Sequence, residues 1–402
     1  MNEMKNSDTA ARFRNVGTRP VRPDGVSKVT GTARYGSDYH APGMLVGKML
    51  RSPHPHARIL SIDTAKAEAV PGVQAIVTGA DFPLLPFRYV GPDRIERNAW
   101  HDSRNVIARE KVFYHGHALA AVAAKDEATA MHAVTLNDVD YEVLPFTIEI
   151  EDAAAEDAPL LFEDMITHHV VPAPEKPSNI SRRWTDTIGN IEAGFSEADE
   201  IVEGTYSNDP AHQGYIEPHA CVAEYNKDGQ AQLWVSSQGH FQMRDQTAAY
   251  AGIPNGDIRA IPAEIGGGFG GKTKVYLEPV AMMLSKKAGR PVKMVMTREE
   301  VFRAPGPAAG TRTWVKIGAR KDGTITAVDL ETWYQSGAFP GGPFVNGCLC
   351  AFSCYGIPNQ RSVGYEVVSN RPKVAAYCAP GAPQTNFAVE SALDVLAIPV
   401  YS

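Results

Sequence analysis

The stretch 265–273, which reads IGGGFGGKT, constrains the fold more than any other part of the chain. Five of the six residues from 266 to 271 are glycine, so this backbone can adopt positive φ and lie against another surface with no Cβ in between. Phe269 is the one bulky side chain among them. The loop therefore predicts a place where the backbone closely approaches a ligand or a second loop.

The segments on either side of the glycine loop predict a strand before it and a helix after it. The upstream pattern indicates a strand over 232–236, a helix over 240–251 and a second strand over 258–261. Downstream, mainly apolar positions predict a helix over 274–288, ended by Gly289-Arg290-Pro291. A strand, glycine loop and helix in this order aim free backbone N–H groups at one spot, and phosphate is the commonest ligand of such an anion cradle.

The glycine loop also satisfies the P-loop pattern G-x-x-x-x-G-K-[ST], from Gly266 to Thr273. Its context argues against an ATPase, because Pro262-Ala-Glu264 interrupts the buried strand expected before a P-loop. An apolar strand ending in Asp does not follow at a plausible distance either. The main interpretation of the loop is therefore a cradle for an anionic ligand other than ATP. Nucleotide binding and a purely structural glycine turn remain the two alternatives.

Composition indicates a globular protein that does not bind nucleic acid or membranes. The length of 402 residues predicts two or three domains on a prior of roughly 100–200 residues each. A net charge of −7, without basic blocks, argues against nucleic acid and anionic membranes as main partners. The first residues lack the apolar region of a secretory signal, and no run of about 18 apolar residues follows. We therefore expect a cytoplasmic protein.

Patterns along the chain predict two α+β domains joined by a linker. Residues 13–150 combine short strands with short helices, including one continuous strand from Val112 through Gly116 to Ala124. Residues 151–182 are acidic and rich in proline, which is typical of a linker. Residues 183–402 alternate strand and helix signals more regularly.

Cysteine and histidine spacings do not predict a metal site made of protein side chains. The five cysteines fit neither zinc ribbons nor iron–sulfur clusters, and Cys348, Cys350 and Cys354 lie in an apolar setting typical of core residues. The histidine pairs 54/56 and 115/117 could share one face of a strand, but a third ligand at a suitable spacing is missing. We therefore assign no metal ligand.

Several motifs together carry a family resemblance over almost the whole chain. Residues 31–38 (GTARYGSD) and 50–59 (LRSPHPHARI) resemble the hammerhead domain of the molybdenum hydroxylases, the xanthine dehydrogenase and aldehyde oxidase family. Residues 215–219, 236–238, 266–272 and 376–384 resemble, in the same order, the first portion of the family's molybdopterin-binding domain. The resemblance implies an α+β fold, with a hammerhead-type α/β domain over 13–150 and part of a mixed α/β molybdopterin-binding domain over 183–402.

The resemblance also implies a cofactor and the residues that contact it. In this family the dithiolene of a pterin holds molybdenum, and the cytosine dinucleotide form is expected here, so the protein mainly supplies hydrogen bonds. Gln238 matches the glutamine that approaches an oxygen on molybdenum, because its carboxamide can donate without carrying charge. Phe269 and Gly270 match the family's Phe-Gly pair. The expected cofactor contacts are Gln238, Gly268, Phe269, Gly270, Cys378 and Ala379.

Two positions depart from the family pattern. Cys378 stands where relatives usually have an arginine, and a thiol supplies neither its charge nor its donors. The carbon monoxide dehydrogenase branch has a cysteine one place further along, after the arginine, so its copper-binding role is not transferred to Cys378. Thr273 stands where purine-oxidising relatives carry a substrate-binding glutamate. This substitution argues against xanthine as the substrate.

The relatives continue for several hundred residues beyond the helix that starts near Gln384 and is predicted to end at Ala397. That missing half carries the glutamate that acts as general base, so we assign no catalytic residue here. We expect either a second polypeptide that completes the domain or a truncated product, and no turnover by this chain alone.

The resemblance finally implies partners and a reaction. An iron–sulfur subunit with [2Fe–2S] clusters and an FAD subunit would carry electrons away, while water-derived oxygen enters an aldehyde, aromatic or N-heterocyclic substrate. The alternative is a non-catalytic fragment or assembly module that keeps the fold without cofactor.

Overall fold

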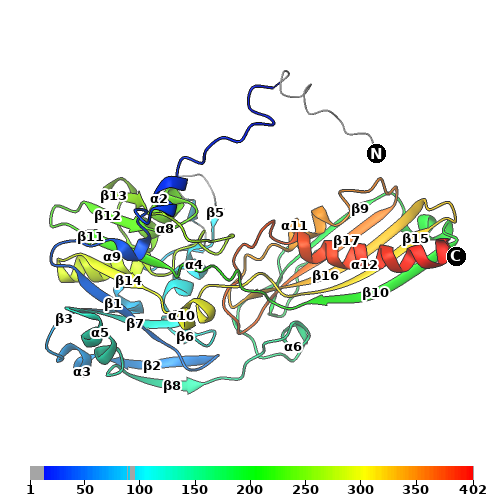
Figure 1. Ribbon diagram of the computed structural model, residues 1–402. Helices are drawn as coiled ribbons and strands as arrows, with labels where there is room; N and C mark the ends of the chain where they lie inside the picture. The colour runs from blue at the N-terminus through cyan, green and yellow to red at the C-terminus, as the bar shows by residue number, and fades with distance from the viewer. Residues whose placement is uncertain (1–12, 88, 91–95, 402) are drawn as a thin grey trace.

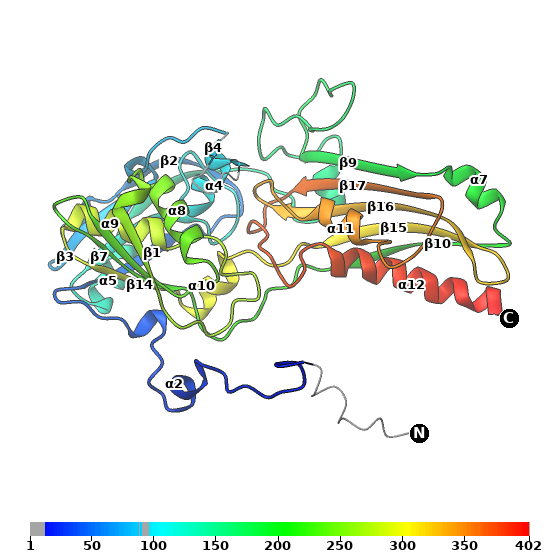
Figure 2. The same cartoon turned by 90° about the horizontal axis from the view of Figure 1, so that it is seen from above.

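The computed structural model describes residues 13–87, 89–90 and 96–401, and its strands form sheets of seven, five, three and two strands. Figures 1 and 2 show two bodies side by side, one built on the seven-stranded sheet and the other on the five-stranded sheet. Helices and strands of both parallel and antiparallel kinds occur, as expected of the predicted α+β class.

The seven-stranded sheet forms the first body. Its strands, in spatial order, are β13 (Ile258–Pro262), β12 (Ala231–Val235), β11 (Ala220–Tyr225), β14 (Val292–Val295), β1 (Leu45–Arg51), β7 (Ala118–Ala124) and β3 (Val73–Thr78). The pairs β12–β13 and β1–β14 are parallel, and the other neighbours are antiparallel. Helices α8 (His240–Ala251) and α9 (Glu278–Ala288) pack against each other and against this sheet.

The strand β7 runs through this sheet, and all seven of its residues are buried. Its sequence, ALAAVAA, is a continuous apolar run, which is typical of a strand covered on both faces. The prediction of one strand from Val112 to Ala124 is wrong, because the chain turns at Gly116 with φ +97° and separates β6 (Lys111–Val112) from β7. Glycine adopts this conformation without the steric cost of a Cβ.

The same sheet takes strands from both sides of the predicted linker. Strands β1, β3 and β7 come from residues 13–150, whereas β11, β12, β13 and β14 come from residues 183–402. The two segments therefore share one hydrogen-bonded sheet and one core. The division of the chain at 151–182 stays a prediction from the sequence.

Smaller elements surround this sheet. The three-stranded sheet consists of β6, β2 (Ala57–Asp63) and β8 (Asp138–Val143), and the two-stranded sheet of β4 (Tyr89–Val90) and β5 (Glu96–Arg97). The short helices are α2 (Gly25–Val29), η1 (Gly36–Asp38), α3 (Ala65–Glu68), η2 (Gly79–Asp81), α4 (Ala99–Val106), α5 (Glu127–Val134), α6 (Ile150–Ala154), η3 (Asn255–Asp257) and α10 (Arg298–Arg303).

The second body consists of the five-stranded sheet and the helices on it. Its strands, in spatial order, are β10 (Glu200–Asn208), β15 (Thr311–Ala319), β16 (Ile325–Gly337), β17 (Gln360–Val368) and β9 (Ile180–Ile188). Helix α12 (Ala382–Tyr401) packs along β10 and β15, beside α11 (Phe344–Cys350), and α7 (Ile191–Ser196) lies at the far end (Figure 2).

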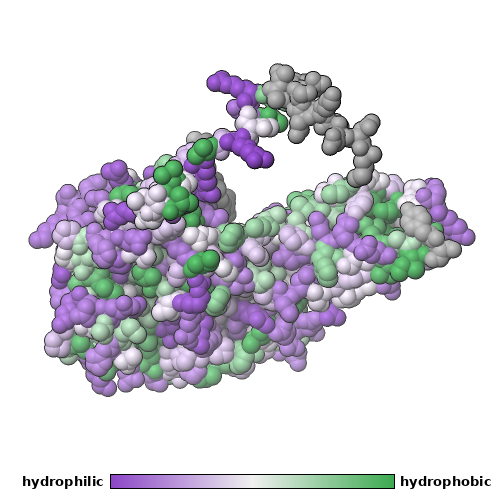
Figure 3. Space-filling model, in the orientation of Figure 1, coloured by the Kyte–Doolittle hydropathy of each residue, from purple (hydrophilic) through white to green (hydrophobic). Residues whose placement is uncertain are grey.

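Helix α12 is longer than predicted. It continues beyond Ala397 to Tyr401, with Pro399 inside its last turn. Val400 packs against the core of the second body, and this packing offsets the helix-breaking tendency of the proline. On the outer side Phe387, Val395 and Ile398 are exposed, and Figure 3 shows apolar surface at this end of the molecule. Across the described ranges, no helix is long and apolar enough to span a bilayer.

Candidate functional site

Sheet topology brings Gln238 to the glycine loop. Strands β12 and β13 are parallel neighbours, so their carboxyl ends lie at the same edge of the sheet, which is where α/β folds place ligands. Gln238 follows β12, and the glycine loop follows β13. The Gly270 N–H donates to Gln238 Oε1 at 2.7 Å, and the Lys272 N–H donates to the same oxygen at 3.3 Å. The backbone N–H of Gln238 donates to Lys272 O at 3.0 Å.

A second loop, residues 376–379, packs on the glycine loop. The Cys378 N–H donates to Phe269 O at 3.1 Å. A Cβ on Gly270 would lie 2.2 Å from Ala376 O, and a Cβ on Gly268 would lie 2.7 Å from Gln238 Oε1. Only glycine permits these approaches. The structure therefore brings Gln238, the glycine loop and the Cys378 loop into one cluster, which we call the upper surface of the site.

Backbone strain is concentrated in the same cluster. Phe269, Cys378 and Ala379 have φ of 52°, 22° and 58°, and they are three of the four non-glycine residues with positive φ in the described chain. Each such conformation costs on the order of 1–3 kcal/mol and persists only where the surroundings hold it. Strain of this kind gathers at ligand sites, which agrees with the position of these three residues.

One part of the predicted anion cradle, the start of the helix, is wrong, and the other, the loop N–H groups, stays a prediction. Helix α9 begins at Glu278 rather than near Lys274, because the Glu278 carboxylate accepts the Tyr276 and Leu277 N–H groups at 2.9 and 3.1 Å. The N–H groups of Tyr276 and Leu277 are therefore already used by Glu278 and are not free for a ligand of the loop. Within the loop, however, the N–H groups of residues 267–269 have no acceptor among the residues that the structure describes.

The underside of the loop is held by an ion pair that the sequence did not predict. Lys272 Nζ lies 2.6 Å from Glu217 Oε2, which also accepts from Ser236 Oγ at 2.5 Å and from the Gly266 N–H at 2.7 Å. The Lys272 side chain is fully buried, and burial lowers its pKa while Glu217 opposes that shift. A P-loop lysine would reach for phosphate. Lys272 instead supports the loop from below.

Tyr215 and His219 continue this support. Lys272 Nζ lies 5.2 Å from the centre of the Tyr215 ring, and the Tyr215 hydroxyl is 2.8 Å from His219 Nε2. Burial lowers the pKa of His219 to about 3, so its imidazole is neutral near pH 7. The motif Tyr215-Ile-Glu217-Pro-His219 thus forms the base of the loop. The only carboxylate of this motif, Glu217, was the one sequence signal that could have indicated an ion pair below the loop.

The upper surface, in contrast, has donors left over. The Phe269 side chain is 51% exposed, and Gln238, Cys378 and Ala379 are exposed as well. The Gln238 carboxamide nitrogen makes no hydrogen bond to any described residue. Together with the three unpaired loop amides, it offers only neutral donors, which suit the phosphate and oxygen atoms of an organic cofactor. Within the described ranges, no three His, Cys, Asp or Glu side chains are grouped to hold a metal ion directly.

Comparison with known families identifies the family to which the chain belongs. Residues 172–400 match the molybdopterin cofactor-binding domain, and residues 30–145 match the aldehyde oxidase and xanthine dehydrogenase a/b hammerhead domain. The chain belongs to the xanthine dehydrogenase and aldehyde oxidase family. The predicted resemblance and the two kinds of domain within the α+β fold are thereby confirmed, and an ATPase is excluded.

Characterised relatives within this family differ in how much of their length the chain spans. It is 36% identical to a probable xanthine dehydrogenase subunit of Bacillus subtilis over 94% of this chain and 48% of that protein. It is 31% identical to the nicotinate dehydrogenase large molybdopterin subunit of Eubacterium barkeri, over 96% of this chain and 86% of that protein. The chain thus spans about half of the first relative and most of the second.

Solved molybdenum hydroxylases share the fold. CO dehydrogenase from Oligotropha carboxidovorans superposes with a TM-score of 0.84 at 30% identity, over 99% of this chain and 50% of that one. Quinoline 2-oxidoreductase from Pseudomonas putida 86 gives a TM-score of 0.82 at 26% identity, over 96% and 48%. Both bodies of the molecule therefore belong to an architecture that family members use.

Proposed function

We propose that this chain is the molybdopterin-binding subunit of a molybdenum hydroxylase, and that its upper surface holds one side of the cofactor. The contacts are Gln238, Gly268, Phe269, Gly270, Cys378 and Ala379. The observation that carries the proposal is the set of neutral donors left unpaired beside a glycine backbone that approaches its neighbours without Cβ atoms. The cofactor is expected in its cytosine dinucleotide form.

Each part of the upper surface has a separate task in this proposal. The Gln238 oxygen is fixed by the Gly270 and Lys272 N–H groups, so its NH₂ group is oriented outward and donates to the cofactor. The unpaired amides of residues 267–269 donate to oxygen atoms of the same ligand. The exposed Phe269 ring excludes water from one side of the cofactor. When bound, the molybdenum centre supplies two-electron redox chemistry.

Cys378 and Thr273 distinguish this site from the usual family pattern. The Cys378 main chain is already used, since its N–H donates to Phe269 O, and its exposed thiol lies 4.0 Å from the same oxygen. Thr273 Oγ1 donates to Gly270 O at 2.8 Å and thereby stabilises the loop. Neither residue supplies the charge that arginine and glutamate supply in relatives. The expected substrate is consequently an aldehyde, an aromatic or an N-heterocycle other than xanthine.

A complete enzyme would need further polypeptides in the cytoplasm. We assign no general base among the described residues; in this proposal a second polypeptide completes the cofactor site, and iron–sulfur and FAD subunits carry electrons away. The large molybdopterin subunit from Eubacterium barkeri, of which this chain spans 86%, supports such a subdivision. The exposed Phe269 and Cys378 give the second polypeptide a surface to cover.

Metal and pterin analysis tests the proposal. The chain, co-produced and purified with its partner polypeptides, should contain close to one molybdenum and one pterin per copy. Gln238→Ala should lower the molybdenum content about tenfold, which is typical when a group that orients a metal site is lost. Gln74→Ala is the matched control, because Gln74 is exposed on β3 and bonds only to Val73 O.

The outcome against the proposal is equally definite. Absence of molybdenum and pterin with every partner present would establish a non-catalytic fragment or assembly module. An equal loss in the Gln238 and Gln74 variants would show that the metal does not depend on the upper surface.

A further inference from the structure

A large cavity lies between the two bodies, next to the upper surface. Its volume is about 810 Å³, which is in the range of sites for small organic molecules. Thr273 and Ala376 line it, so it reaches both loops of the site. One wall is aromatic and apolar and consists of Phe87, Trp100, His101, Phe162 and Met165. An aromatic ring of a ligand would find apolar contacts along this wall.

Lys373 places an unbalanced positive charge in this cavity. Its side chain is 7% exposed, and Nζ donates to Phe339 O at 3.4 Å and to Pro340 O. No carboxylate of the described chain lies within 4 Å of Nζ. An ammonium group has three N–H donors, so one donor remains free after two of them bond to the carbonyls of Phe339 and Pro340. Burial lowers the pKa of Lys373; Asp102 and Glu366 oppose this shift from a greater distance, whereas the charges of Lys274 and Arg182 add to it.

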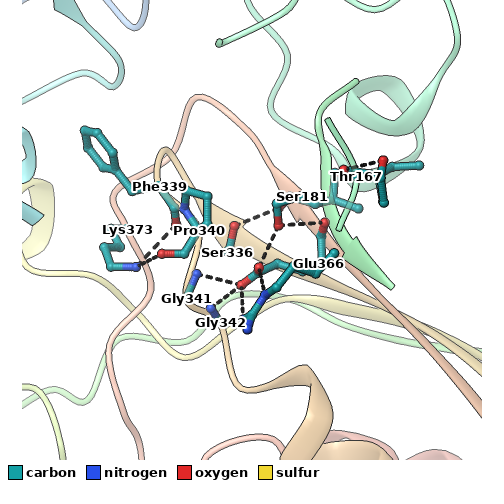
Figure 4. Close-up of polar contacts among 12 residues, drawn as sticks. Thr167, Ser181, Ser336, Phe339, Pro340, Gly341, Gly342, Glu366 and Lys373 are labelled. Carbon is teal, nitrogen blue, oxygen red and sulfur yellow. Dashed lines mark hydrogen bonds and ion pairs between the residues drawn. The ribbon is translucent and has the colours of Figure 1, made fainter. Parts of the chain in front are cut away.

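The turn 339–342 holds Lys373 in place, and a buried carboxylate holds the turn. Glu366 is fully buried and accepts the Gly341 N–H at 2.7 Å and also the Gly342 N–H (Figure 4). Lys373 donates to carbonyl groups of the same turn. The turn is therefore bound by the Glu366 carboxylate through its N–H groups and by the Lys373 amino group through its carbonyls. A Cβ on Gly341 would lie 2.8 Å from Lys373 Nζ. Two hydrogen bonds to the turn therefore hold the Lys373 amino group at the cavity wall.

The other charges near the cavity are already balanced. Glu366 accepts from Ser181 Oγ at 2.6 Å and from Arg182 Nε at 2.9 Å. Asp102 accepts from the Tyr250 hydroxyl at 3.3 Å and lies 4.0 Å from Lys274 Nζ. Asp164 is exposed, so water screens its charge. Lys373 is thus the cation that an anionic group of a ligand would stabilise most.

His101 supplies a second unpaired polar atom on the wall of the cavity. Its side chain is 7% exposed, and Nδ1 has no hydrogen-bond partner in the described part of the chain. Burial, with a smaller effect of Lys373, lowers the pKa of His101 to about 4, so the ring is neutral near pH 7. A buried polar atom without a partner costs free energy that a ligand can recover.

We propose that this cavity binds a planar aromatic carboxylate, with its carboxylate on Lys373, its ring against the aromatic wall and His101 Nδ1 as a further polar contact. This inference deepens the proposed function by naming the substrate class, and it rests on that function for the claim that the ligand is oxidised. Binding itself does not require the cofactor.

Two ligands of similar shape, one anionic and one neutral, test whether Lys373 recognises a negative charge. Binding of 2-naphthoate and of neutral 2-naphthamide to the full chain is measured by calorimetry at pH 7 without cofactor. We expect the carboxylate to bind at least about tenfold more tightly, because a hydrogen bond to a charged group is stronger than one to a neutral group. Lys373→Met should reduce this preference to less than about threefold. Lys227→Met is the control and should retain the preference, because Lys227 is exposed in the turn between β11 and β12 and does not line the cavity.

A spectroscopic readout places the ligand. The ring resonances of His101 should shift on addition of 2-naphthoate to the unmodified protein, which needs no substitution to fold. Equal binding of the two ligands, a preference that Lys373→Met retains, or unchanged His101 resonances would each overturn the proposal. If the chain binds the carboxylate but never contains molybdenum, the proposed function is wrong, whereas the proposed carboxylate site is retained.

Discussion

The base of the glycine loop and the cavity between the bodies each bury one lysine, but in opposite ways. Below the loop, Lys272 Nζ lies 2.6 Å from a Glu217 oxygen. In the cavity, Lys373 is bound by two neutral carbonyls, and a carboxylate within 4 Å is missing from the described residues around it. The first charge is balanced within the protein. The second has no carboxylate in direct contact among the described residues.

The two regions also bury one histidine each, with the same contrast. His219, below the loop, has its Nε2 atom 2.8 Å from the Tyr215 hydroxyl. His101, in the cavity, leaves Nδ1 without a partner in the described chain. Both imidazoles are neutral because burial lowers their pKa values, to about 3 and about 4. In these two regions, the paired histidine lies in the base of the loop and the unpaired one lines the cavity.

The largest expected effect is the loss of the ion pair below the loop. Lys272→Met should lower the free energy of unfolding by about 3–5 kcal/mol, because it leaves the Glu217 carboxylate without its cation. Denaturant unfolding measures this change. Lys227→Met is the control, since Lys227 is exposed in the turn between β11 and β12. Similar free energies of unfolding for Lys272→Met and Lys227→Met would show that Lys272 does not support the loop, and the contrast with Lys373 in the cavity would be lost.

The next effect is a pH dependence caused by His219. Its pKa is about 3 in the folded protein against an ordinary value of 6.5, so between these values the unfolded chain binds a proton that the folded chain does not. The unfolding free energy should therefore fall with decreasing pH, and His219 should contribute about 1.4 kcal/mol per pH unit. His219→Gln should make the slope shallower by that amount between about pH 6 and pH 4.

Exposed His40 gives the control for this measurement. His40→Gln should leave the slope as in the unmodified protein. A slope that is the same in the His219 and His40 variants would show that the imidazole below the loop is not held in its neutral form.

The sequence was sufficient to predict the parts of the site that local pattern determines. The glycine run, Gln238 after one strand and the Phe269-Gly270 pair all lie within 34 residues, 238–271, and two parallel neighbouring strands bring them to one edge. Helix α8 has the predicted bounds, 240–251. In this region local propensity and tertiary structure agree, as they do in well-determined folds.

Features that depend on distant contacts were not predictable. Lys272 follows glycines as a P-loop lysine does, and only its contact with Glu217, 55 residues away, shows that it points inward. The pairing of β1 with β14 joins residues 45–47 to residues 292–294 across the predicted linker. Lys373 belongs to a polar sequence in which its burial is visible only once the turn 339–342 and Glu366 are in place. Such contacts are long-range and leave no periodic trace in the sequence.

The smallest effect on stability is expected in the cavity, and it tests the comparison most sharply. Lys373→Met should change the free energy of unfolding by no more than about 1 kcal/mol, because removing a buried unbalanced charge offsets the loss of two hydrogen bonds to carbonyls. Thermal and denaturant unfolding beside Lys272→Met measure the difference. A loss as large as that of Lys272→Met would mean that Lys373 supports the fold in the same way, and the distinction between the two regions would fail.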